Sequence, residues 1–240
     1  MNLCIDIGNS FIKYGIFDND KLVKQNRVKT LLVRDLKSLI AKYNIDKAIL
    51  STTRRSLPRF CDYLKRTLRF RVLDHKTDLP FENTYGTKKT LGKDRLAAVA
   101  GAQSLFPNKS CLVVDIGTCV TYDLLTKKSI YLGGNIAPGK DLRLRSMHDY
   151  TSALALAKPK FTNPLLGKST NMALQNGAIY GIVFEIEALS ARLQRQIGKI
   201  NVILTGGDAL KFGELIECKK FVFPNLVLTG LNAILKHNEN

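Results

Sequence analysis

The chain opens with the stretch LCIDIGNSFIKYGIFDNDKLV (residues 3–23), and a second stretch, LVVDIGTCVTYDLLTKKSIYL (residues 112–132), repeats its plan. In both, an apolar run ends in Asp-Ile-Gly and is followed by a small polar residue, a second apolar run, a polar turn and a third run. Short apolar runs bounded by turn residues are typical of β-strands, and the FDNDK turn at 17–21 suits a hairpin. The repeat therefore predicts two halves of the molecule that each begin with a β-hairpin.

Alternating patterns of strands and helices follow each copy of the repeat. After the first copy, the hydrophobic spacing predicts helices over 33–45, 56–68 and 94–106, strands over 47–52 and 70–75, and a loop over 76–93. After the second copy, it predicts strands over 111–116, 119–126 and 129–133, a glycine-rich turn over 133–139, a helix over 170–197, a strand that ends in the Gly pair of 200–209, and a helix over 224–237. Ser56 and Pro58 suit the N-cap and first turn of the second helix. The alternation predicts an α/β fold of two duplicated domains, 1–107 and 108–240.

The charge balance of the chain is strongly basic. Its 240 residues include 37 Lys and Arg against 20 Asp and Glu, a formal net charge of +17. Such a field favours anionic partners, namely nucleic acid, anionic lipid or phosphorylated metabolites. Because the basic residues are spread from Lys13 to Lys236, a solvated surface without a specific partner is the favoured interpretation. The densest run, residues 54–71, is compatible with a basic patch and equally with one helix that has a polar face.

The cysteines and histidines show no metal-binding pattern. The five cysteines contain no Cys-x-x-Cys pair, and an odd number without a framework indicates a reducing compartment. The three histidines have no ligand spacing, so we expect structural or exposed roles for them. The chain shows neither a signal-like N-terminus nor an apolar run of the roughly 20 residues that cross a bilayer. These features predict a cytoplasmic protein without a membrane segment.

The Asp-Ile-Gly repeat has a chemistry that suits a bound phosphate and its cation. A Gly directly after a buried strand lets backbone N–H groups approach an anion closely, because no Cβ stands in the way. Asp6 and Asp115 supply oxygens for a hard cation, directly or through water. Lys13 is long enough to reach a phosphate. The short polar side chains beside the two glycines are Asn9, Ser10 and Thr118.

A single Asp-Ile-Gly is equally well explained as a strand end with a turn glycine. Two matched copies, together with TGGDA at 205–209, favour a nucleotide clamp made by two loops across an interdomain cleft. The chain has no GxGxxG after a strand and no GxxxxGK[ST], which excludes Rossmann and P-loop sites. Phosphate binding must then rest on hairpin loops, as in the actin-like, Hsp70-like and sugar-kinase ATPases.

Six motifs in sequence order resemble those of the type III pantothenate kinases, a family of the actin-like (ribonuclease H-like) ATPase superfamily. DIGNSFIK (6–13) is similar to the family's DxGN phosphate loop, and GKDR (92–95) to its GxDR motif. DIGTCVT (115–121) is similar to the family's DxGTxxT motif, and GGNIAPG (133–139) to its GGxIxPG motif. STNMALQNGAIYG (169–181) is similar to the family's Thr-bearing segment, and TGGDA (205–209) to its Gly pair near the nucleotide. The resemblance covers nearly the whole chain.

The resemblance implies roles for individual residues. Asp94 is implied as the general base that takes the proton from the primary hydroxyl of pantothenate, and Asp115 as the site of a monovalent cation, K⁺ or ammonium. Asp6 is implied to help place a Mg²⁺ that bridges the phosphates of ATP. The implied ATP-binding residues are Asp6, Ile7, Gly8, Asn9, Ser10, Phe11, Ile12, Lys13 and Thr118. The implied pantothenate pocket consists of Tyr85, Gly92, Lys93, Asp94, Arg95 and Thr170.

Several of these residues also have ordinary structural explanations. Asp94 and Arg95 begin a predicted helix, where Asp is favoured as a cap or first-turn residue. Tyr85 is compatible with an ordinary loop aromatic, and Lys13 with a solvated strand residue. Thr170 suits the N-cap of the long helix. The accompanying motifs favour the functional interpretation of Asp94 and Tyr85.

Two segments depart from the family's pattern. Lys93 stands where the family usually has a small residue. Its ammonium either favours the ionised form of the neighbouring base and contacts a phosphate, or it points into solvent. The segment 143–160, expected to be a loop that contributes to a dimer contact, has Ala where Pro is common.

The expected function is transfer of the γ-phosphoryl group of ATP to pantothenate by a homodimer, giving 4′-phosphopantothenate, the first intermediate on the route to coenzyme A. Three alternatives remain open: a DNA-associated accessory regulator, suggested by the +17 charge, a catalytically silent nucleotide-binding module, suggested by Lys93, and a relative that acts on another small hydroxylated substrate. No helix-turn-helix, zinc site or aromatic RNA-binding motif supports the first alternative, so nucleic acid is not an expected partner.

Overall fold

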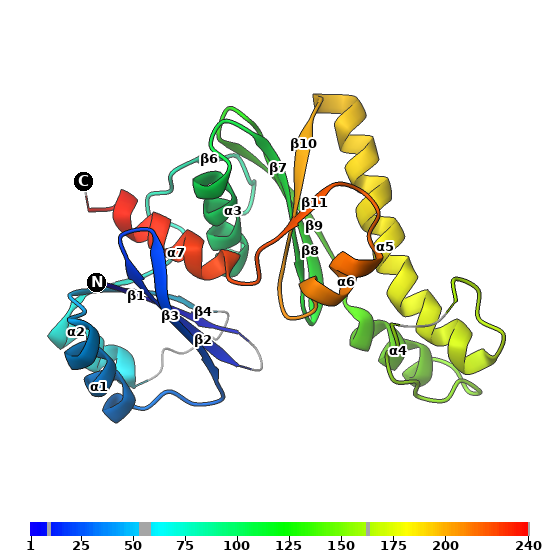
Figure 1. Cartoon of the computed structure of the whole chain (residues 1–240), viewed down its shortest axis with the longest axis horizontal. Coiled ribbons are helices and arrows are strands. Elements are labelled where there is room, and N and C mark those ends of the chain that lie inside the picture. Colours follow the sequence, from blue (N-terminus) through cyan, green and yellow to red (C-terminus); the bar gives the residue numbers. More distant parts are fainter. Residues whose placement is uncertain (9–10, 53–58, 162–163, 240) are drawn as a thin grey trace. The chain divides into compact units, whose positions relative to one another are not determined.

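The structure is a computed structural model of the chain, and it describes residues 1–8, 11–52, 59–161 and 164–239 (Figure 1). These residues group into two compact units. Unit 1 consists of Met1–Asn108, Leu125–Leu132 and Asn225–Asn240, and unit 2 of Lys109–Leu124 and Gly133–Pro224. The predicted division after residue 107 is next to the first boundary between the units, but two later segments return to unit 1.

Unit 1 is built on a five-stranded sheet with the order β3-β2-β1-β4-β5. Its strands are β1 (Asn2–Ile7), β2 (Ile12–Asp18), β3 (Lys21–Val28), β4 (Lys47–Thr52) and β5 (Arg69–Val72). The first three strands run antiparallel as the predicted hairpins, while β4 is parallel to β1 and β5 is parallel to β4. Asn19 makes the turn between β2 and β3 with a φ of 51°, a conformation that Asn adopts more readily than most residues.

Helices α1 (Val33–Tyr43) and α2 (Phe60–Thr67) cover one face of this sheet. Alternate residues of β1 point to that face because side chains alternate along a strand. The apolar residues that meet there include Leu3, Ile5 and Ile7 of β1, Leu36 of α1 and Leu64 of α2. The predicted N-cap Ser56 and first-turn residue Pro58 lie outside the described residues.

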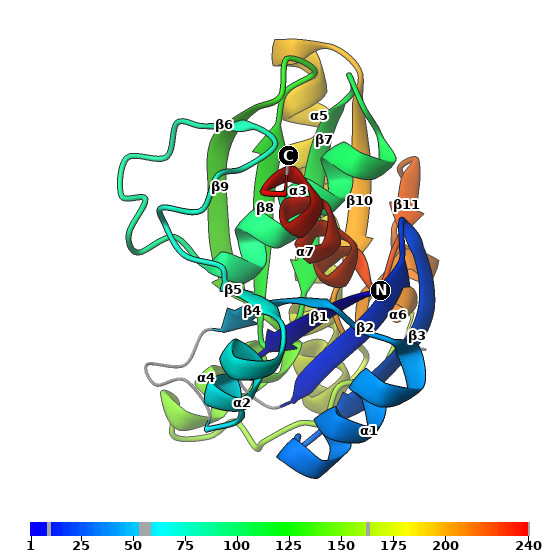
Figure 2. The same ribbon diagram turned by 90° about the vertical axis from the view of Figure 1, so that its left-hand side faces the viewer.

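Two glycines allow α3 (Lys93–Leu105) and α7 (Leu226–His237) to pack closely in unit 1 (Figure 2). A Cβ on Gly230 would lie 1.6 Å from the carbonyl oxygen of Ala97, and a Cβ on Gly101 would lie 2.4 Å from a carbonyl oxygen of α7. Only glycine permits backbones to approach so closely. Because α7 also contacts β1, β2 and β4, the last helix of the chain belongs to the first unit.

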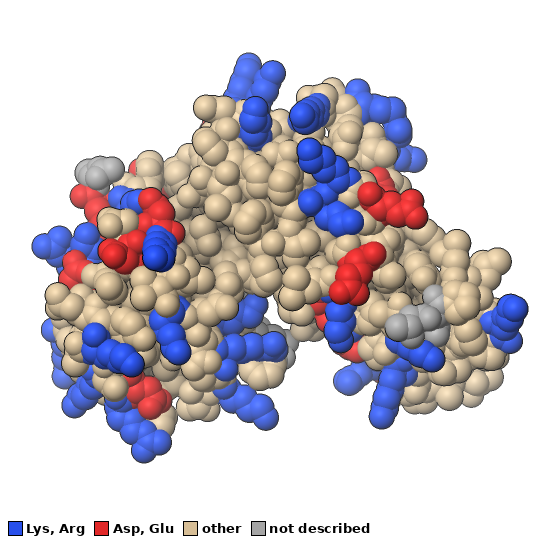
Figure 3. Space-filling view, in the orientation of Figure 1, with Lys and Arg blue, Asp and Glu red and all other residues tan. Residues whose placement is uncertain are grey.

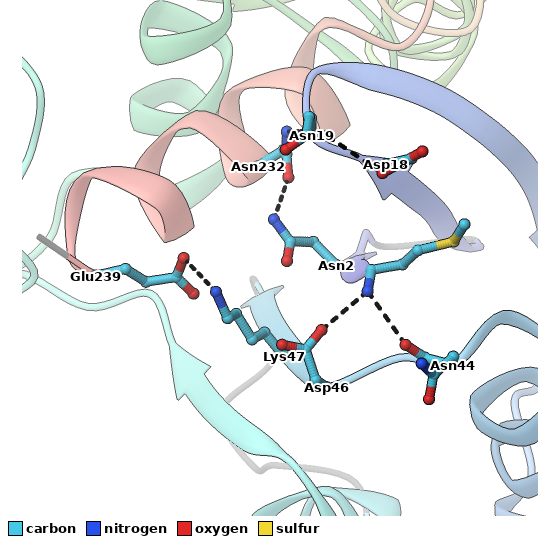
Figure 4. Close-up of polar contacts among 9 residues, drawn as sticks. Asn2, Asp18, Asn19, Asn44, Asp46, Lys47, Asn232 and Glu239 are labelled. Carbon is cyan, nitrogen blue, oxygen red and sulfur yellow. Dashed lines mark hydrogen bonds and ion pairs between the residues drawn. The ribbon is translucent and has the colours of Figure 1, made fainter.

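Polar contacts join the C-terminal helix to the first strands (Figure 4). Asn232 of α7 accepts a hydrogen bond of 2.8 Å from Asn2 and donates one of 2.8 Å to the carbonyl oxygen of Asn19. Asn2 and Asn232 are buried, so these bonds avoid the cost of a buried polar group without a partner. Lys47 and Glu239 add an ion pair of 2.8 Å.

The second sheet has the strand order β11-β10-β7-β8-β9-β6. Its strands are β7 (Ser110–Ile116), β8 (Cys119–Leu125), β9 (Ile130–Pro138), β10 (Ile200–Thr205), β11 (Lys220–Val222) and the short β6 (Glu82–Asn83). Most of this sheet lies in unit 2, whereas β6, the end of β8 and the first residues of β9 belong to unit 1. Without β6, the order β9-β8-β7-β10-β11 is the same as the order β3-β2-β1-β4-β5 of the first sheet.

The helices of unit 2 are α4 (Lys140–Asp149), α5 (Thr170–Ile197) and α6 (Ala209–Leu215). The long helix α5 has the predicted bounds, and one stripe of it packs on the sheet through Ile179, Ile182, Val183 and Ile186. Its N-cap is Ser169, whose hydroxyl accepts a hydrogen bond of 3.3 Å from the backbone N–H of Met172. The interpretation of Thr170 as the N-cap is therefore wrong, because Thr170 is the first helical residue.

Two other predictions about unit 2 are wrong. Residues 133–138 continue β9 instead of forming a turn. Gly134 allows β9 to pack closely against β8, since a Cβ on this residue would lie 1.6 Å from the carbonyl oxygen of Tyr122 on β8. Residues 143–149, expected as part of a loop, belong to α4. Leu144 is the one buried residue of α4, so the sequence carries no apolar stripe that would reveal a helix.

The basic side chains are scattered over the surface. On the face drawn in Figure 3, Lys and Arg are distributed over both units and do not gather in one patch. Within the described ranges, no helix combines the length and the apolar character needed to cross a membrane.

Candidate functional site

The first Asp-Ile-Gly forms the hairpin between β1 and β2. Asp6 lies near the end of β1, where it is 9% exposed, and its register partner on β2 is Lys13. The N–H of Gly8 donates a hydrogen bond of 3.1 Å to the carbonyl oxygen of Phe11 and closes the loop. A carboxylate and an ammonium group therefore stand side by side at the base of a glycine-containing loop, which suits a phosphate and its metal ion.

The residues of this predicted ATP loop do not all offer a side chain. Ile7 and Ile12 are 0% and 4% exposed and belong to the core of unit 1, so only their backbone groups are available to a ligand. Asn9 and Ser10 lie outside the described residues.

Both aspartates of the repeat have a buried hydroxyl group beside them, which the sequence motifs do not reveal. Ser51 of β4 is the register partner of Asp6, and Thr205 of β10 is the register partner of Asp115. Side chains of register partners lie on the same face of a sheet. Ser51 and Thr205 are fully buried, and in the part of the chain that the structure describes neither hydroxyl has a hydrogen-bond partner. The two halves therefore share this Asp–hydroxyl pair as well as the Asp-Ile-Gly sequence.

Asp94 lies in the first turn of α3, two residues after the N-cap residue Gly92. Its carboxylate accepts a hydrogen bond of 2.9 Å from the backbone N–H of Arg95. A Cβ on Gly92 would lie 2.5 Å from Oδ1 of Asp94, so the glycine leaves room for the carboxylate. The start of the helix thus orients Asp94, and its position as a first-turn residue is compatible with a catalytic role.

An aromatic stack holds Arg95 close to Asp94. The Arg95 side chain is buried, and its guanidinium carbon lies 5.7 Å from the ring centroid of Tyr85. Tyr85 stacks on Tyr131 with ring centroids 6.2 Å apart. The Thr84 hydroxyl anchors the same loop by donating a hydrogen bond of 2.7 Å to the carbonyl oxygen of Tyr131. Unit 1 therefore brings the predicted residues Tyr85, Asp94 and Arg95 together. Tyr131 supports Tyr85, a role that the sequence did not reveal because Tyr131 lies in an ordinary apolar strand pattern.

Lys93 is held by its own loop. Its ammonium donates a hydrogen bond of 2.8 Å to the carbonyl oxygen of Leu91. Burial lowers the pKa of Lys93, and attraction to Asp74 and Asp94 opposes that shift. Lys93 therefore does not point freely into solvent, and its ammonium is attracted to Asp94.

Three glycine-containing loops of unit 2 meet at the end of β7. The N–H of Gly139 donates a hydrogen bond of 3.0 Å to the carbonyl oxygen of Thr118. The N–H of Asp208 donates one of 3.1 Å to the carbonyl oxygen of the residue after Asp115. Gly206 has a φ of 97°, and a Cβ there would lie 2.4 Å from Oδ1 of Asp115. The second predicted phosphate and cation site is therefore where three loops converge, those that contain DIGT (115–118), APGK (137–140) and TGGD (205–208).

An ion pair joins two of these loops. The ammonium of Lys140 lies 2.5 Å from Oδ2 of Asp208 and 2.9 Å from Oδ2 of Asp141. Burial acts to lower the pKa of Lys140, but hydrogen bonds and attraction from Asp208 and Asp141 raise it overall. None of the sequence motifs includes Lys140, although this charged residue directly follows GGNIAPG and was an available signal.

The oxygen atoms of the two Asp-Ile-Gly sites are ligands that suit hard cations. Among the described residues, no three His, Cys, Asp or Glu side chains gather as a metal site. Mg²⁺ in phosphoryl-transfer sites commonly uses one or two carboxylates together with substrate phosphates, which Asp6 alone can satisfy. At the second site, Oδ1 of Asp115 and the carbonyl oxygen of Ile116 lie 2.4 and 2.5 Å from the position that a Cβ on Gly206 would take. Only glycine at position 206 leaves these two oxygen atoms undisturbed, and the assignment of Asp115 to a monovalent cation remains a prediction. Thr118 and Thr170 are exposed, on the β7–β8 loop and in the first turn of α5.

Comparison with known sequences gives one consistent result. A profile of the family described as "Type III pantothenate kinase" matches residues 2–192. A protein with that name from Christiangramia forsetii is 39% identical over 100% of this chain and 99% of its own length. Proteins of the same name from Bacteroides fragilis and Cytophaga hutchinsonii are 38% and 36% identical, over 99% of this chain and 98% and 100% of their own lengths.

Solved structures share the fold. A "conserved putative Baf family transcriptional activator" from Campylobacter jejuni matches with a TM-score of 0.64 and 22% identity over 99% of both chains. A putative 2-dehydro-3-deoxygalactonokinase from Sinorhizobium meliloti matches with a TM-score of 0.63 and 12% identity, again over 99% of both chains. At these identities the likeness shows the fold alone, a mixed α/β fold, which confirms the predicted class at that level.

Proposed function

The chain belongs to the type III pantothenate kinase family, and on that premise we propose how its residues transfer the γ-phosphoryl group of ATP to the primary hydroxyl of pantothenate. The activity is that of a pantothenate kinase, which forms 4′-phosphopantothenate in coenzyme A biosynthesis. One observation carries the proposal at the level of residues. Unit 1 holds Asp94, Arg95 and Tyr85 together at the start of α3, with the carboxylate oriented by the helix itself.

Asp94 acts as the general base. Its carboxylate takes the proton of the pantothenate hydroxyl while the hydroxyl oxygen forms a bond to the γ-phosphorus. The bond between that phosphorus and the bridging oxygen breaks, and ADP leaves. A general base contributes roughly 10²–10⁴-fold to the rate. Because the transition state of phosphoryl transfer is loose, the remainder comes from positioning and from neutralisation of charge.

Arg95 and Tyr85 bind pantothenate. The planar guanidinium of Arg95 suits the carboxylate of pantothenate, since its parallel N–H groups can reach both oxygens. Tyr85 keeps the guanidinium in place by stacking, so little side-chain freedom is lost when the substrate binds. Gly92, Lys93 and Thr170 belong to the same pocket by family resemblance.

ATP is bound by the loop from Asp6 to Lys13 and by Thr118. The kinase reaction requires a divalent metal, for which we propose Mg²⁺ held by Asp6 and the phosphates. When bound, this metal neutralises part of the phosphate charge. Asp115 and the carbonyl oxygens around it hold K⁺ or ammonium in this proposal.

In this proposal both halves descend from one duplicated actin-like domain. The two copies of the repeat begin the predicted domains 1–107 and 108–240, and α7, at the end of the second, packs in unit 1. The common strand order of the two sheets and the Asp–hydroxyl pair in each support the duplication. The nucleotide cleft between the halves is inferred from the repeat of the two loops. The homodimer and the cytoplasmic location are inferred from family resemblance and cysteine usage.

The test is ADP production from ATP and Mg²⁺, with and without pantothenate, in K⁺ and in Na⁺. Asp94→Asn keeps the size of the side chain and removes the base, so we expect turnover to fall by roughly 10²-fold or more. Asp62→Asn is a matched control, because Asp62 occupies the first turn of α2 and is 73% exposed. Turnover that does not depend on pantothenate, or that survives in Asp94→Asn, would contradict the proposal.

The regulator and the silent module are not favoured. The relatives that match over their full length carry the name of a kinase, and on the face drawn in Figure 3 the basic side chains form no single patch. The same assay decides between kinase and silent module, since a module binds ATP without consuming it.

A further inference from the structure

One polar row crosses the sheet of unit 1. Its successive register partners are Ser51 of β4, Asp6 of β1, Lys13 of β2 and Arg27 of β3. Register partners point to the same face of a sheet. That face is opposite to the one covered by α1 and α2, because Asp6 alternates with the core residues of β1. A carboxylate and two cations are therefore neighbours on one face, at the end of β1 where the predicted phosphate loop begins.

The two positively charged side chains of this row repel each other when no ligand is bound. Lys13 and Arg27 are directly opposite each other on antiparallel strands, where Cβ atoms are about 5 Å apart and like charges repel. Asp6 stands on the other side of Lys13. In the part of the chain that the structure describes, the guanidinium of Arg27 has no carboxylate within ion-pair distance. An anion placed beside the row would relieve the repulsion.

Stacking on the phosphate loop fixes the position of Arg27. Its guanidinium carbon lies 3.7 Å from the ring centroid of Phe11. The carbonyl oxygen of Phe11 accepts the hydrogen bond from Gly8 that closes the loop. A guanidinium that stacks through its face keeps the N–H donors at its edge available. Arg27 thus supports the loop and presents donors next to it.

We propose that Arg27 is a phosphate-binding residue of the nucleotide site, which acts with Lys13 on the phosphate chain of a nucleoside triphosphate and supports the loop through Phe11. This inference rests on the proposed function, because it adds a residue to the ATP site that the function requires. Arg27 lies outside all six motifs, and its place in the site depends on the pairing of β3 with β2.

Nucleotide binding without pantothenate tests the inference. Calorimetry would compare ATP, ADP and adenosine, each with Mg²⁺, on wild type, Arg27→Gln and Arg27→Lys. We expect Arg27→Gln to weaken ATP binding about tenfold or more, as for the loss of a charge-assisted hydrogen bond, and to leave adenosine within about twofold. Arg27→Lys keeps the charge without the planar stack and should recover part of the loss. The dependence of ATP affinity on ionic strength should also become weaker in Arg27→Gln.

Lys24→Gln is the matched control, because Lys24 is an exposed cation on the same strand whose register partner is the core residue Ile16. This control should bind all three ligands as wild type does. Equal weakening of ATP and adenosine in Arg27→Gln, or no weakening of ATP, would overturn the inference. If the wild type binds ATP but does not phosphorylate pantothenate, the proposed function fails while the loss of ATP binding in Arg27→Gln still supports the role of Arg27. Absence of any ATP binding by the folded wild type would overturn both.

Discussion

Lys140 and Asp208 are far apart in the sequence, but they form an ion pair in which Nζ of Lys140 lies 2.5 Å from Oδ2 of Asp208. Lys140 follows Gly139, whose N–H is bonded to Thr118, and Asp208 follows the Gly pair beside Asp115. The ion pair therefore couples the two loops that approach the second Asp-Ile-Gly. Since the side chains of Lys140 and Asp208 are 13% and 19% exposed, water screens their attraction less than it screens a surface pair.

Replacing Lys140 by Met should lower the free energy of unfolding by about 2 kcal/mol at pH 7, because a largely buried carboxylate loses its ammonium partner. Lys236→Met removes a pair whose partner, Asp20, is 72% exposed, and it should cost less than about 1 kcal/mol. Urea unfolding of the two variants measures the difference. Equal losses would mean that the inner pair contributes no more than a surface pair.

The contribution of Lys140 should also depend on pH in one direction. The pKa of Lys140 in the folded protein is raised above the ordinary 10.5, because the pull of Asp208 and Asp141 outweighs the effect of burial. The stabilisation is therefore fully present below the unfolded pKa and is lost as the pH rises through the folded pKa. The stability gap between wild type and Lys140→Met should be constant near neutral pH and shrink above 10.5. A gap that widens with alkaline pH would contradict this assignment.

Gly230→Ala should destabilise the protein by about 3 kcal/mol or more and lower the activity, since the added methyl would collide with the backbone of Ala97 and push apart the helix that carries Asp94. Gly177→Ala provides the comparison, because Gly177 is also inside a helix but a Cβ there meets no atom within 4 Å. That variant should be stabilised by up to about 1 kcal/mol. Thermal unfolding and the ADP assay test both expectations, and a similar effect of the two variants would refute the close-packing argument.

Gly206→Ala should abolish stimulation by K⁺, because its Cβ would lie 2.4 Å from Oδ1 of Asp115 and displace the carboxylate. Gly198→Ala carries a comparable positive φ of 82° without any contact within 4 Å, so it shares the backbone strain but not the collision. We expect that control to lose about 1 kcal/mol of stability and to keep its response to K⁺. Titration of K⁺ in the ADP assay separates the two. Normal K⁺ stimulation in Gly206→Ala would remove Asp115 from the cation site.

Tyr85→Ala should raise the KM for pantothenate about tenfold and change the KM for ATP by less than about twofold, because it removes the ring that holds Arg95 in the substrate pocket. Tyr150→Ala is the control, since Tyr150 is 88% exposed. Initial rates with each substrate varied in turn give the two constants. If both KM values rise together, Tyr85 supports the fold of unit 1 as a whole and not the pocket alone.

Features that depend on short segments could be predicted well. The spacing of apolar residues gave the bounds of α5 at 170–197, and the hairpin pattern gave the first strands of both sheets. The six motifs gave the family, which the full-length relatives confirm. The glycine-rich segment 133–138 was mistaken for a turn because a glycine that turns the chain and one that lets strands approach look the same in a sequence.

By itself, the sequence determined the alternation of strands and helices and the family, because both depend on residue types at short spacings, and the same motifs predict the site residues. Only the tertiary structure decided that α7 belongs to unit 1, that Lys140 pairs with Asp208, and that Arg27 stands beside Lys13, with Asp6 on the other side of Lys13. Those relationships join segments that are separate along the chain. They follow from strand register and from the backbone contact that glycine allows, and no local spacing encodes which distant segment packs against which.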